Sequence, residues 1–320
     1  MTDPNSVFLD LSTIDRGDLE LARLRRVSPH WEIFDRTAPE LTLERIKGAH
    51  IVVTNKVVLE RRILAGAPNL KLICIAATGT NNVDLEAARE MGIHVTNVVR
   101  YATPAVVQHV FGLILALTTR LSDYRESVIQ GAWQRSDQFC LLDFPIRELS
   151  GRTLGIVGYG ELGQAVGRVA EAFGMVLLVA QRPGGPTRPG RSPLCELLPR
   201  ADIVTLHCPL TETTRNLICY DELTLMKPDA LLINTARGGI VDEQALADTL
   251  RQGGIGGAGL DVLGVEPPSE GNPLLQPGIP NLIVTPHIAW ASRESRQRLI
   301  DEVALSIEAF WEGREWNRVV

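Results

Sequence analysis

The chain has 320 residues, 45% of them hydrophobic, which is enough to bury more than one core. Its 32 basic and 38 acidic side chains leave a net charge of −6, which argues against nucleic acid or an anionic membrane as the main partner. The five cysteines are widely spaced and contain no CxxC pair, which argues against a zinc site and favours free thiols in a reducing cytoplasm.

Neither the beginning of the sequence nor its most apolar run suggests export or membrane insertion. Residues 1–6 lack the basic region and apolar core of a signal peptide. The most apolar run, residues 110–117, is too short to span a bilayer and is typical of a buried helix. We therefore expect a cytoplasmic protein without a membrane partner.

The first hundred residues alternate between short apolar runs and helical or polar intervals. This alternation predicts a parallel sheet in an α/β unit. Thr103 and Pro104 then mark a helix start, with apolar positions running on to Leu121, and residues 131–145 have so little periodicity that we interpret them as a packing arm. The predicted strands are residues 7–9, 31–34, 51–53, 72–75 and 93–95.

A second set of six apolar runs follows, again alternating with helical segments, as in dinucleotide-binding domains. These runs are residues 154–157, 176–179, 203–206, 231–234, 259–262 and 282–285. An amphipathic helix begins after Ser292, and we expect it to return to the first sheet. The fold class is therefore α/β, with two doubly wound parallel-sheet domains. Residues 100–287 form a Rossmann domain inserted in a substrate domain of residues 1–99 and 288–320.

The segment from Arg152 to Arg168 contains a GxGxxG motif, formed by Gly158, Gly160 and Gly163, between a predicted strand and a predicted helix. Such glycines allow a tight turn, the approach of a pyrophosphate to the backbone, and close packing of helix on strand. A structural glycine turn is the alternative. The strand before the motif and the helix after it favour dinucleotide binding.

Three residues with catalytic chemistry lie at or after the ends of later strands, where ligands bind in open α/β sheets: Arg237, Glu266 and His287. An arginine can bind a substrate carboxylate, and a histidine can transfer a proton at neutral pH. A neighbouring carboxylate would orient the histidine and favour its imidazolium form. Taken singly, each could be a surface arginine, a turn glutamate or a packed loop histidine. Their common position after a GxGxxG motif favours hydride transfer to a 2-keto acid.

Several motifs resemble those of the D-isomer-specific 2-hydroxyacid dehydrogenases over nearly the whole chain. Loops 77–84 and 101–109 look most like the glycerate dehydrogenase, or hydroxypyruvate reductase, branch of that family. The resemblance implies a flavodoxin-like substrate domain, a homodimer formed through the nucleotide domain, and hydride transfer between NAD(P)H and a small 2-keto acid such as hydroxypyruvate or glyoxylate. The motifs are residues 158–163, 234–242, 259–262, 266–267 and 285–289.

The resemblance also implies roles for individual residues. Arg237 binds the substrate carboxylate, His287 is the proton donor, and Glu266 pairs with His287. The backbone N–H groups of Thr78 and Gly79 bind the carboxylate from the other domain. Further cofactor contacts are implied at Thr103, Glu161, Leu162, His207, Cys208, Pro209, Thr235, Ala236, Asp261 and Ala289.

The cofactor preference depends on the end of the second strand of the nucleotide domain. NAD-selective sites have an acidic residue there, about 20 residues after the glycines, whereas this chain has Gln181 and Arg182. Without that carboxylate, and with Arg188 and Arg191 nearby, the sequence favours NADP over NAD. The alternative is a solvated loop whose arginines contact nothing.

Other conspicuous residues have simpler interpretations. His109 lies in the apolar helix and is expected to be an interior or interface histidine with satisfied hydrogen bonds, not a second acid–base group. Trp133 and Trp290 are expected to be core or interface aromatics. Two alternative functions stay open. One is a dehydrogenase for D-lactate, phosphoglycerate or phosphite, and the other is a non-catalytic dinucleotide sensor, which the Arg, Glu and His set disfavours.

Overall fold

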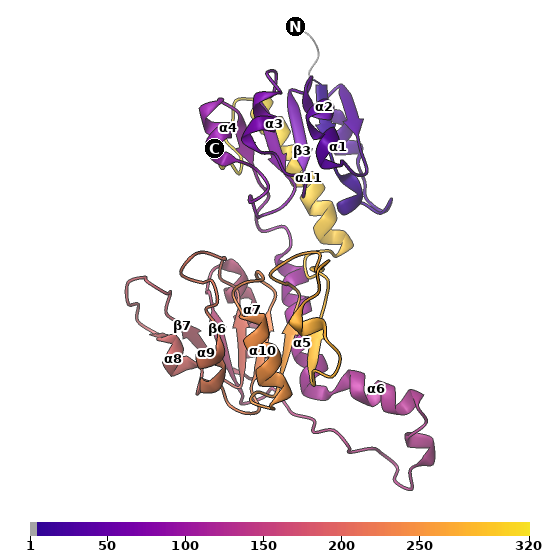
Figure 1. Ribbon diagram of the computed structural model, residues 1–320, viewed down its shortest axis with the longest axis vertical. Helices are drawn as coiled ribbons and strands as arrows, with labels where there is room; N and C mark the ends of the chain where they lie inside the picture. The colour runs from indigo at the N-terminus through magenta and orange to yellow at the C-terminus, as the bar shows by residue number, and fades with distance from the viewer. Residues whose placement is uncertain (1–4) are drawn as a thin grey trace. The chain divides into compact units, whose positions relative to one another are not determined.

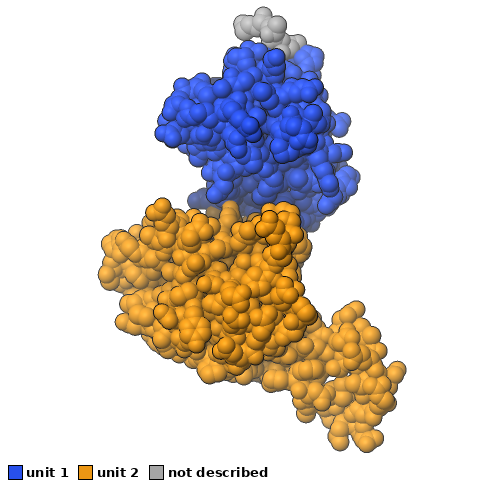
Figure 2. Space-filling view, viewed as in Figure 1, with its two compact units in different colours: residues 1–102, 290–320 blue, residues 103–289 orange. Residues whose placement is uncertain are grey.

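The computed structural model describes residues 5–320, and the chain divides into two compact units (Figures 1 and 2). Unit 1 comprises residues 1–102 and 290–320, and unit 2 is the continuous segment Thr103–Ala289. These boundaries lie three and two residues after those expected from sequence. The expectation about a signal peptide concerns residues 1–6, of which residues 1–4 lie outside the described part.

Unit 1 contains a five-stranded parallel sheet in the order β2-β1-β3-β4-β5, the flavodoxin-like order expected of the substrate domain. Strands β3 and β4 are buried along their whole length, which is why they read as continuous apolar runs. The strands are β1 (Asn5–Phe8), β2 (His30–Ile33), β3 (Ile51–Thr54), β4 (Leu72–Ile75) and β5 (His94–Thr96). The helices are α1 (Ala22–Arg26), α2 (Thr42–Ile46), α3 (Arg61–Ala65), α4 (Leu85–Glu90) and α11 (Arg293–Trp311), with 3-10 turns at Leu11–Thr13 and Pro39–Leu41.

Helix α11 returns the C-terminal part of the chain to unit 1, as the sequence predicted. Ser292 caps it by accepting a hydrogen bond from the backbone N–H of Ser295. The apolar face of α11 is buried against strands β1, β3 and β4. This core includes Leu299, Ile300, Val303, Ala304 and Ile307 of α11 together with Phe8, Val53 and Cys74 of the strands.

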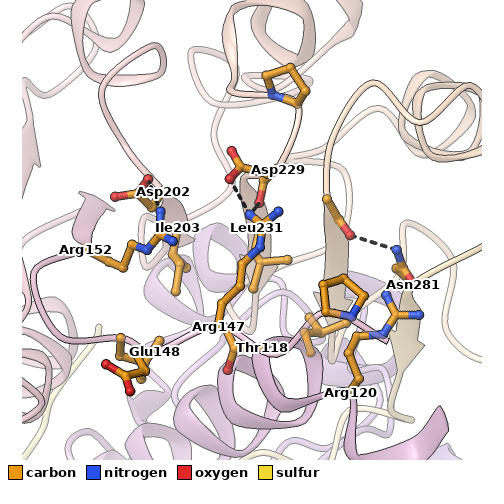
Figure 3. A pocket seen from close by; sticks show the side chains of 15 residues that line it. Thr118, Arg120, Arg147, Glu148, Arg152, Asp202, Ile203, Asp229, Leu231 and Asn281 are labelled. Carbon is orange, nitrogen blue, oxygen red and sulfur yellow. Dashed lines mark hydrogen bonds and ion pairs between the residues drawn. The ribbon is translucent and has the colours of Figure 1, made fainter. Parts of the chain in front are cut away.

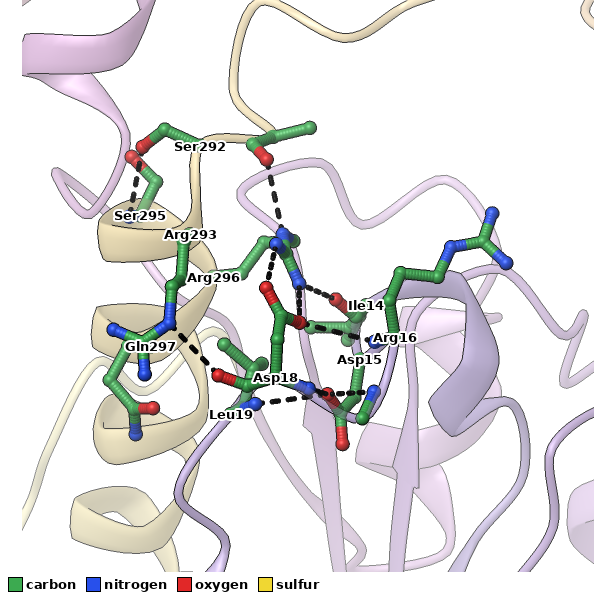
Figure 4. A network of polar contacts seen from close by, with 12 residues as sticks. Ile14, Asp15, Arg16, Asp18, Leu19, Ser292, Arg293, Ser295, Arg296 and Gln297 are labelled. Atoms are coloured by element: carbon green, nitrogen blue, oxygen red, sulfur yellow. Dashed lines mark hydrogen bonds and ion pairs between the residues drawn. The ribbon is translucent and has the colours of Figure 1, made fainter.

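A polar network fastens the first turns of α11 to the loop that follows β1 (Figure 4). Both outer nitrogens of the Arg296 guanidinium donate to the Asp18 carboxylate at 2.8 Å, and one of them also donates to the carbonyl of Ile14 at 2.9 Å. Arg293 donates from Nε to the carbonyl of Asp18 at 2.9 Å. The two ends of the chain therefore share a polar contact as well as an apolar core.

Unit 2 contains a seven-stranded parallel sheet in the order β12-β11-β10-β9-β6-β7-β8. The order reverses at β6, which is the doubly wound pattern expected of a Rossmann domain. The six predicted strands are present, and the structure adds β8, which has only two residues and no apolar signal. The strands are β6 (Thr153–Val157), β7 (Val176–Ala180), β8 (Arg191–Ser192), β9 (Ile203–Leu206), β10 (Leu231–Asn234), β11 (Gly257–Leu260) and β12 (Leu282–Val284).

Helices cover this sheet, and the buried helix predicted around residues 110–117 lies within α5. The helices of unit 2 are α5 (Thr103–Thr119), α6 (Leu121–Ile129), α7 (Glu161–Ala172), α8 (Leu194–Leu197), α9 (Tyr220–Leu225) and α10 (Glu243–Arg251), with 3-10 turns at Trp133–Arg135 and Pro273–Leu275. Arg120 has a left-handed φ of 56°, which separates α5 from α6. The predicted helix therefore ends two residues before Leu121, and α6 was not predicted.

Helix α6 and the following segment form an extension of unit 2 that projects from the rest of that unit in Figure 1. Within residues 5–320, no single helix is long and apolar enough to cross a membrane, and only α5 and α6 taken together meet that criterion, across a bend of 59°.

Candidate active site

The glycine motif forms the tight turn between β6 and α7. Gly158 has a φ of +92°, and a Cβ there would lie 2.6 Å from the backbone of both His207 and Cys208 at the end of β9. A Cβ on Gly163 would overlap the carbonyl oxygen of Gly158, whereas one on Gly160 would face open space. The first and third glycines thus allow close packing, and the second leaves room beside the N-terminus of α7, as a bound pyrophosphate requires.

Two buried polar atoms at the carboxyl edge of this sheet have no hydrogen-bond partner among the described residues: Nδ1 of His207 and Oγ1 of Thr235. His207 follows β9 and Thr235 follows β10, so both lie at the carboxyl edge of the sheet. Buried polar groups normally have partners, and a bound dinucleotide would supply them. The other His207 nitrogen, Nε2, lies 3.0 Å from the Thr205 hydroxyl, and burial lowers the pKa of His207 to about 4. The residues present therefore fit a dinucleotide.

Other predicted cofactor contacts gather at the same edge. The hydroxyl of Thr103, at the start of α5, donates to the carboxylate of Glu161, at the start of α7, at 2.9 Å. Leu162 lies next to Glu161 and is half-buried, and Cys208 is buried after β9. Pro209 is exposed.

The end of β7 carries Gln181 and a loop rich in arginine. Gln181 accepts a hydrogen bond from the backbone N–H of Arg188 at 3.2 Å and donates to the carbonyl of Pro186. The Arg191 guanidinium lies over the Tyr159 ring of the glycine motif, 4.9 Å from its centroid. Arg182 and Arg188 are exposed. The end of β7 is therefore positively charged, and Gln181 stands where NAD-selective sites have an acid.

Arg237 lies in the turn after β10, and buried Asn234 shapes this turn. The Asn234 side chain accepts from the N–H of Ala236 at 3.0 Å and donates to the carbonyl of Arg237 at 2.9 Å. Gly238 packs so closely that a Cβ would overlap the backbone of Leu263. Because Leu263 precedes the loop that carries Glu266, Gly238 brings the Arg237 turn against that loop.

His287 and Glu266 form a pair, as predicted. Nδ1 of His287 lies 2.5 Å from Oε2 of Glu266, and the other carboxylate oxygen accepts from the N–H of Leu263 at 2.8 Å. The Glu266 loop is braced in turn by Glu243, which accepts from the N–H of Gly264 at 2.6 Å. The carboxylate thus holds the imidazole through Nδ1, which makes Nε2 the nitrogen that can exchange a proton with a ligand.

Asp261 and Ala289 were both predicted as cofactor contacts, and the structure shows that they bond to each other. The N–H of Ala289 donates to Oδ2 of Asp261 at 2.7 Å, and the N–H of Ile288 donates to Oδ1 at 2.9 Å. Asp261 is buried and holds the backbone directly after His287. Ala236, also predicted as a cofactor contact, is buried in the turn before Arg237.

Thr78 and Gly79 belong to unit 1 and follow β4. The Thr78 hydroxyl donates to the carbonyl of Val98 at 2.7 Å, and Asn97 donates from its side chain to the carbonyl of Thr78 at 2.7 Å. These bonds hold the loop in shape within unit 1. Binding of a substrate carboxylate by the Thr78 and Gly79 N–H groups stays a prediction.

A cavity of about 180 Å³ lies at the opposite, amino edge of the unit 2 sheet (Figure 3). Its lining includes four residues that lie just before strands β6, β9, β10 and β12: Arg152, Asp202, Asp229 and Asn281. Arg147 pairs with Asp229 across it. Because dinucleotides bind at the carboxyl edge of such sheets, this cavity is separate from the candidate site.

The sequence interpretation missed the supporting residues Asn234, Gly238 and Glu243. Asn234 and Gly238 lie within a quoted motif, but nothing in a single sequence tells that they shape the Arg237 turn. Glu243 begins α10, far in sequence from the loop that it braces. Only the fold shows these contacts.

Comparison with known proteins agrees with this geometry. Residues 111–289 match the model of the D-isomer specific 2-hydroxyacid dehydrogenase NAD binding domain. The chain is 46% identical to glycerate dehydrogenase of Methylorubrum extorquens, over 98% of each chain, and 37% identical to hydroxypyruvate reductase of Blautia hydrogenotrophica, also over 98% of each.

Among solved structures, D-lactate dehydrogenase from Aquifex aeolicus complexed with NAD and lactic acid is 29% identical. It aligns with a TM-score of 0.81 over 97% of this chain and 96% of that chain. The extent of these matches, together with the glycine turn and the Glu266 and His287 pair, shows that the chain belongs to the D-isomer specific 2-hydroxyacid dehydrogenase family.

Proposed function

We propose that this protein reduces a small 2-keto acid, hydroxypyruvate or glyoxylate, with NAD(P)H, or runs the reverse oxidation of glycerate or glycolate. The observation that carries the proposal is the His287 and Glu266 pair at 2.5 Å, at the same sheet edge as the Arg237 turn and the glycine turn. The substrate follows from the relatives named glycerate dehydrogenase and hydroxypyruvate reductase.

Each catalytic residue has one task in the proposed reaction. NAD(P)H, when bound, would supply the hydride for reduction of the keto carbon. Arg237 binds the substrate carboxylate through its planar, permanently charged guanidinium and polarises the neighbouring carbonyl. His287 gives its Nε2 proton to the carbonyl oxygen as the alcohol forms, and Glu266 stabilises the imidazolium and holds the ring through Nδ1.

Steady-state kinetics with hydroxypyruvate, glyoxylate, pyruvate and phosphohydroxypyruvate test both the function and the substrate. We expect turnover to be fastest with hydroxypyruvate or glyoxylate. His287→Ala should lower kcat by about 10²- to 10⁴-fold, the usual contribution of a general acid, while dinucleotide binding is retained. The control is His30→Ala, because His30 is exposed in unit 1.

Near-normal turnover of the His287→Ala enzyme would reject His287 as the acid. If the unaltered protein binds dinucleotide tightly but turns over no keto acid, the proposed function is wrong and a dinucleotide sensor is the better interpretation. Preference for pyruvate or phosphohydroxypyruvate would keep the reaction and change the substrate.

We propose further that NADP(H) is the preferred cofactor. The support is the neutral Gln181 at the end of β7, the exposed Arg182 and Arg188, and the Arg191 guanidinium held over Tyr159. A 2′-phosphate would gain charge-assisted hydrogen bonds from these arginines and meet no carboxylate at residue 181.

The ratio of kcat/KM for NADPH to that for NADH tests this preference. We expect a ratio above one in the unaltered protein. Gln181→Asp should invert it, because a carboxylate accepts from a ribose 2′-OH and repels a 2′-phosphate. Arg200→Ala is the matched control, an exposed arginine after α8. A ratio below one before any substitution would overturn the proposal.

We also propose that two copies pair through the extension formed by α6 and residues 130–146. The Phe139 and Leu142 side chains are 89% and 81% exposed, and Ile129 and Trp133 are also exposed. Internal bonds hold the extension in shape, including one from the Trp133 ring N–H to the carbonyl of Phe139 at 3.0 Å. Clustered exposed apolar side chains on an ordered segment are typical of an interface.

Light scattering coupled to size-exclusion chromatography tests the dimer. The unaltered protein should elute as a dimer, and the double variant Phe139→Ser/Leu142→Ser should elute as a monomer. Val58→Ser, which replaces another exposed apolar side chain in unit 1, should leave the dimer intact. A monomeric unaltered protein, or a dimeric double variant, would contradict the proposal.

A further inference from the structure

His109 contacts the turn that carries the proposed acid. Its Nε2 lies 2.9 Å from the hydroxyl oxygen of Thr285 and 3.5 Å from Oδ1 of Asp261. The His109 side chain is 20% exposed, and that of Asp261 is 1% exposed. His109 lies on α5, whereas Thr285 follows β12 and Asp261 follows β11, so the contact joins three separate elements.

The donors in this contact follow from the chemistry of the groups. The Thr285 hydroxyl donates to Oδ1 of Asp261 at 2.5 Å, and a hydroxyl has a single proton to donate. The single hydroxyl proton of Thr285 is therefore donated to Asp261. Thr285 must then accept from His109, which requires a proton on Nε2 of His109. The direction is fixed: His109 donates to Thr285, and Thr285 donates to Asp261.

Asp261 in turn determines the backbone around His287. Its carboxylate accepts from the N–H groups of Ile288 and Ala289, and its carbonyl accepts from the N–H of His287 at 2.8 Å. His287 has a left-handed φ of 55°. That conformation is unfavourable for a non-glycine residue and persists only where its surroundings over-determine it.

We propose that His109 is a positioning residue for the proton donor. Through Thr285 it orients the Asp261 carboxylate, which keeps His287 in its left-handed conformation and its ring beside Glu266. This inference rests on the proposed role of His287 as the acid. A packed histidine with a merely structural role would affect stability and leave the chemical step of the folded enzyme unchanged.

The experiment compares four substitutions. His109→Phe keeps a ring and removes the donor, whereas His109→Gln keeps an N–H donor of similar reach. Thr285→Val removes the hydroxyl between His109 and Asp261. The control is Thr118→Val, on the same helix, because the hydrogen bonds that the Thr118 hydroxyl makes among residues 5–320 stay within α5, to the carbonyls of Ile114 and Leu115.

We expect His109→Phe to lower kcat by about 10-fold or more, since misplacing a reacting group by about 1 Å can cost about 10²-fold. The keto-acid KM and the dinucleotide Kd should change by no more than about 3-fold, well below that loss. His109→Gln should recover most of the rate. The double variant His109→Phe/Thr285→Val should be no slower than the slower single variant, because both remove the same contact.

Hydrogen exchange supplies a readout that does not depend on activity. The amides of Ile288 and Ala289 should exchange faster in His109→Phe and Thr285→Val than in Thr118→Val. If the unaltered protein turns over no keto acid, the proposed function fails, and exchange still decides whether His109 orders the turn.

Any one of four results would overturn the inference. They are an unchanged kcat in His109→Phe, an effect on KM alone, losses of kcat that multiply in the double variant, and unchanged amide exchange at residues 288 and 289. If His109→Phe does not fold, the kcat of Thr285→Val is compared with that of Thr285→Ser instead. Serine retains the hydroxyl that contacts His109, and valine removes it. Equal kcat in those two variants would then reject the proposed contact.

Discussion

Gly238 shows how strongly a single position can constrain the candidate site. We expect Gly238→Ala to lower kcat/KM by about 10²-fold, because the added methyl would overlap the Leu263 backbone and separate the Arg237 turn from the Glu266 loop. Steady-state kinetics measure this loss. Gly112→Ala in α5 is the control, since a Cβ there meets no atom within 4 Å. Equal activity of the two variants would show that the loop adapts without cost.

We expect the buried imidazole of His207 to make the stability of the protein depend on pH. Burial lowers the pKa of His207 to about 4 in the folded state, whereas an exposed histidine has a pKa of about 6.5. Between these values the unfolded chain binds the extra proton, so the free energy of unfolding should fall as the pH drops from about 6.5 towards 4, by at most about 3 kcal/mol. Urea unfolding without cofactor should show a shallower decline in His207→Asn. An identical decline in both proteins would assign it to other groups.

Among the site residues, the sequence predicted the contact between Glu266 and His287 and missed the contacts that support it, while the catalytic roles stay predictions. Glu266 and His287 form the predicted pair, because carboxylate and imidazole placed after neighbouring strands lie at one sheet edge. Asn234 acts through hydrogen bonds to the backbone of its own turn, and Gly238 acts through close packing against the backbone of Leu263. The residue type alone predicts neither contact. His109 was expected to be an interior or interface histidine with its hydrogen bonds satisfied, and that its partner is Thr285 depends on how α5 packs on the sheet.

At the scale of elements, the docking of α11 in unit 1 depends partly on charge. Arg296 holds the pKa of the Asp18 carboxyl well below its usual range. A carboxyl whose pKa is lowered by folding stabilises the folded state at pH values above the ordinary Asp pKa, about 3.9. This stabilisation is lost as the pH falls below that value. Asp18→Asn should therefore lower Tm more at pH 7 than at pH 3. The difference should also shrink in high salt, because the pair is partly exposed. A Tm difference that does not depend on pH would reject the ion pair as its cause.

The strands were predicted nearly in full because buried parallel strands must be continuous apolar runs. Strand β8 lacked that signal, since its two residues are Arg191 and Ser192. The helix expected to reach Leu121 ends at Thr119, because Arg120 adopts a left-handed conformation that arginine has no preference for. Local pattern therefore located the elements, while tertiary contacts set their ends.

For the whole molecule, chain connectivity predicts different behaviour of the two units. Unit 2 is one continuous segment, so a fragment of residues 103–289 should unfold cooperatively and bind dinucleotide. A fragment of residues 1–102 should not fold alone, because α11 supplies Leu299, Ile300, Val303 and Ile307 to its core. Adding a peptide of residues 290–320 should restore its circular dichroism signal. A cooperatively folded 1–102 fragment would contradict this expectation.

The sequence by itself determined the fold class and the pattern of strands and helices, because apolar periodicity and glycine spacing are local properties of the chain. Only the tertiary structure decided which backbone passes against Gly158 and Gly238, which residue supports the Glu266 loop, and which side chain His109 contacts in the turn of His287. Those outcomes depend on contacts between residues far apart in sequence, such as His109 and Thr285, which are 176 positions apart. Packing creates such contacts, and no local pattern encodes them.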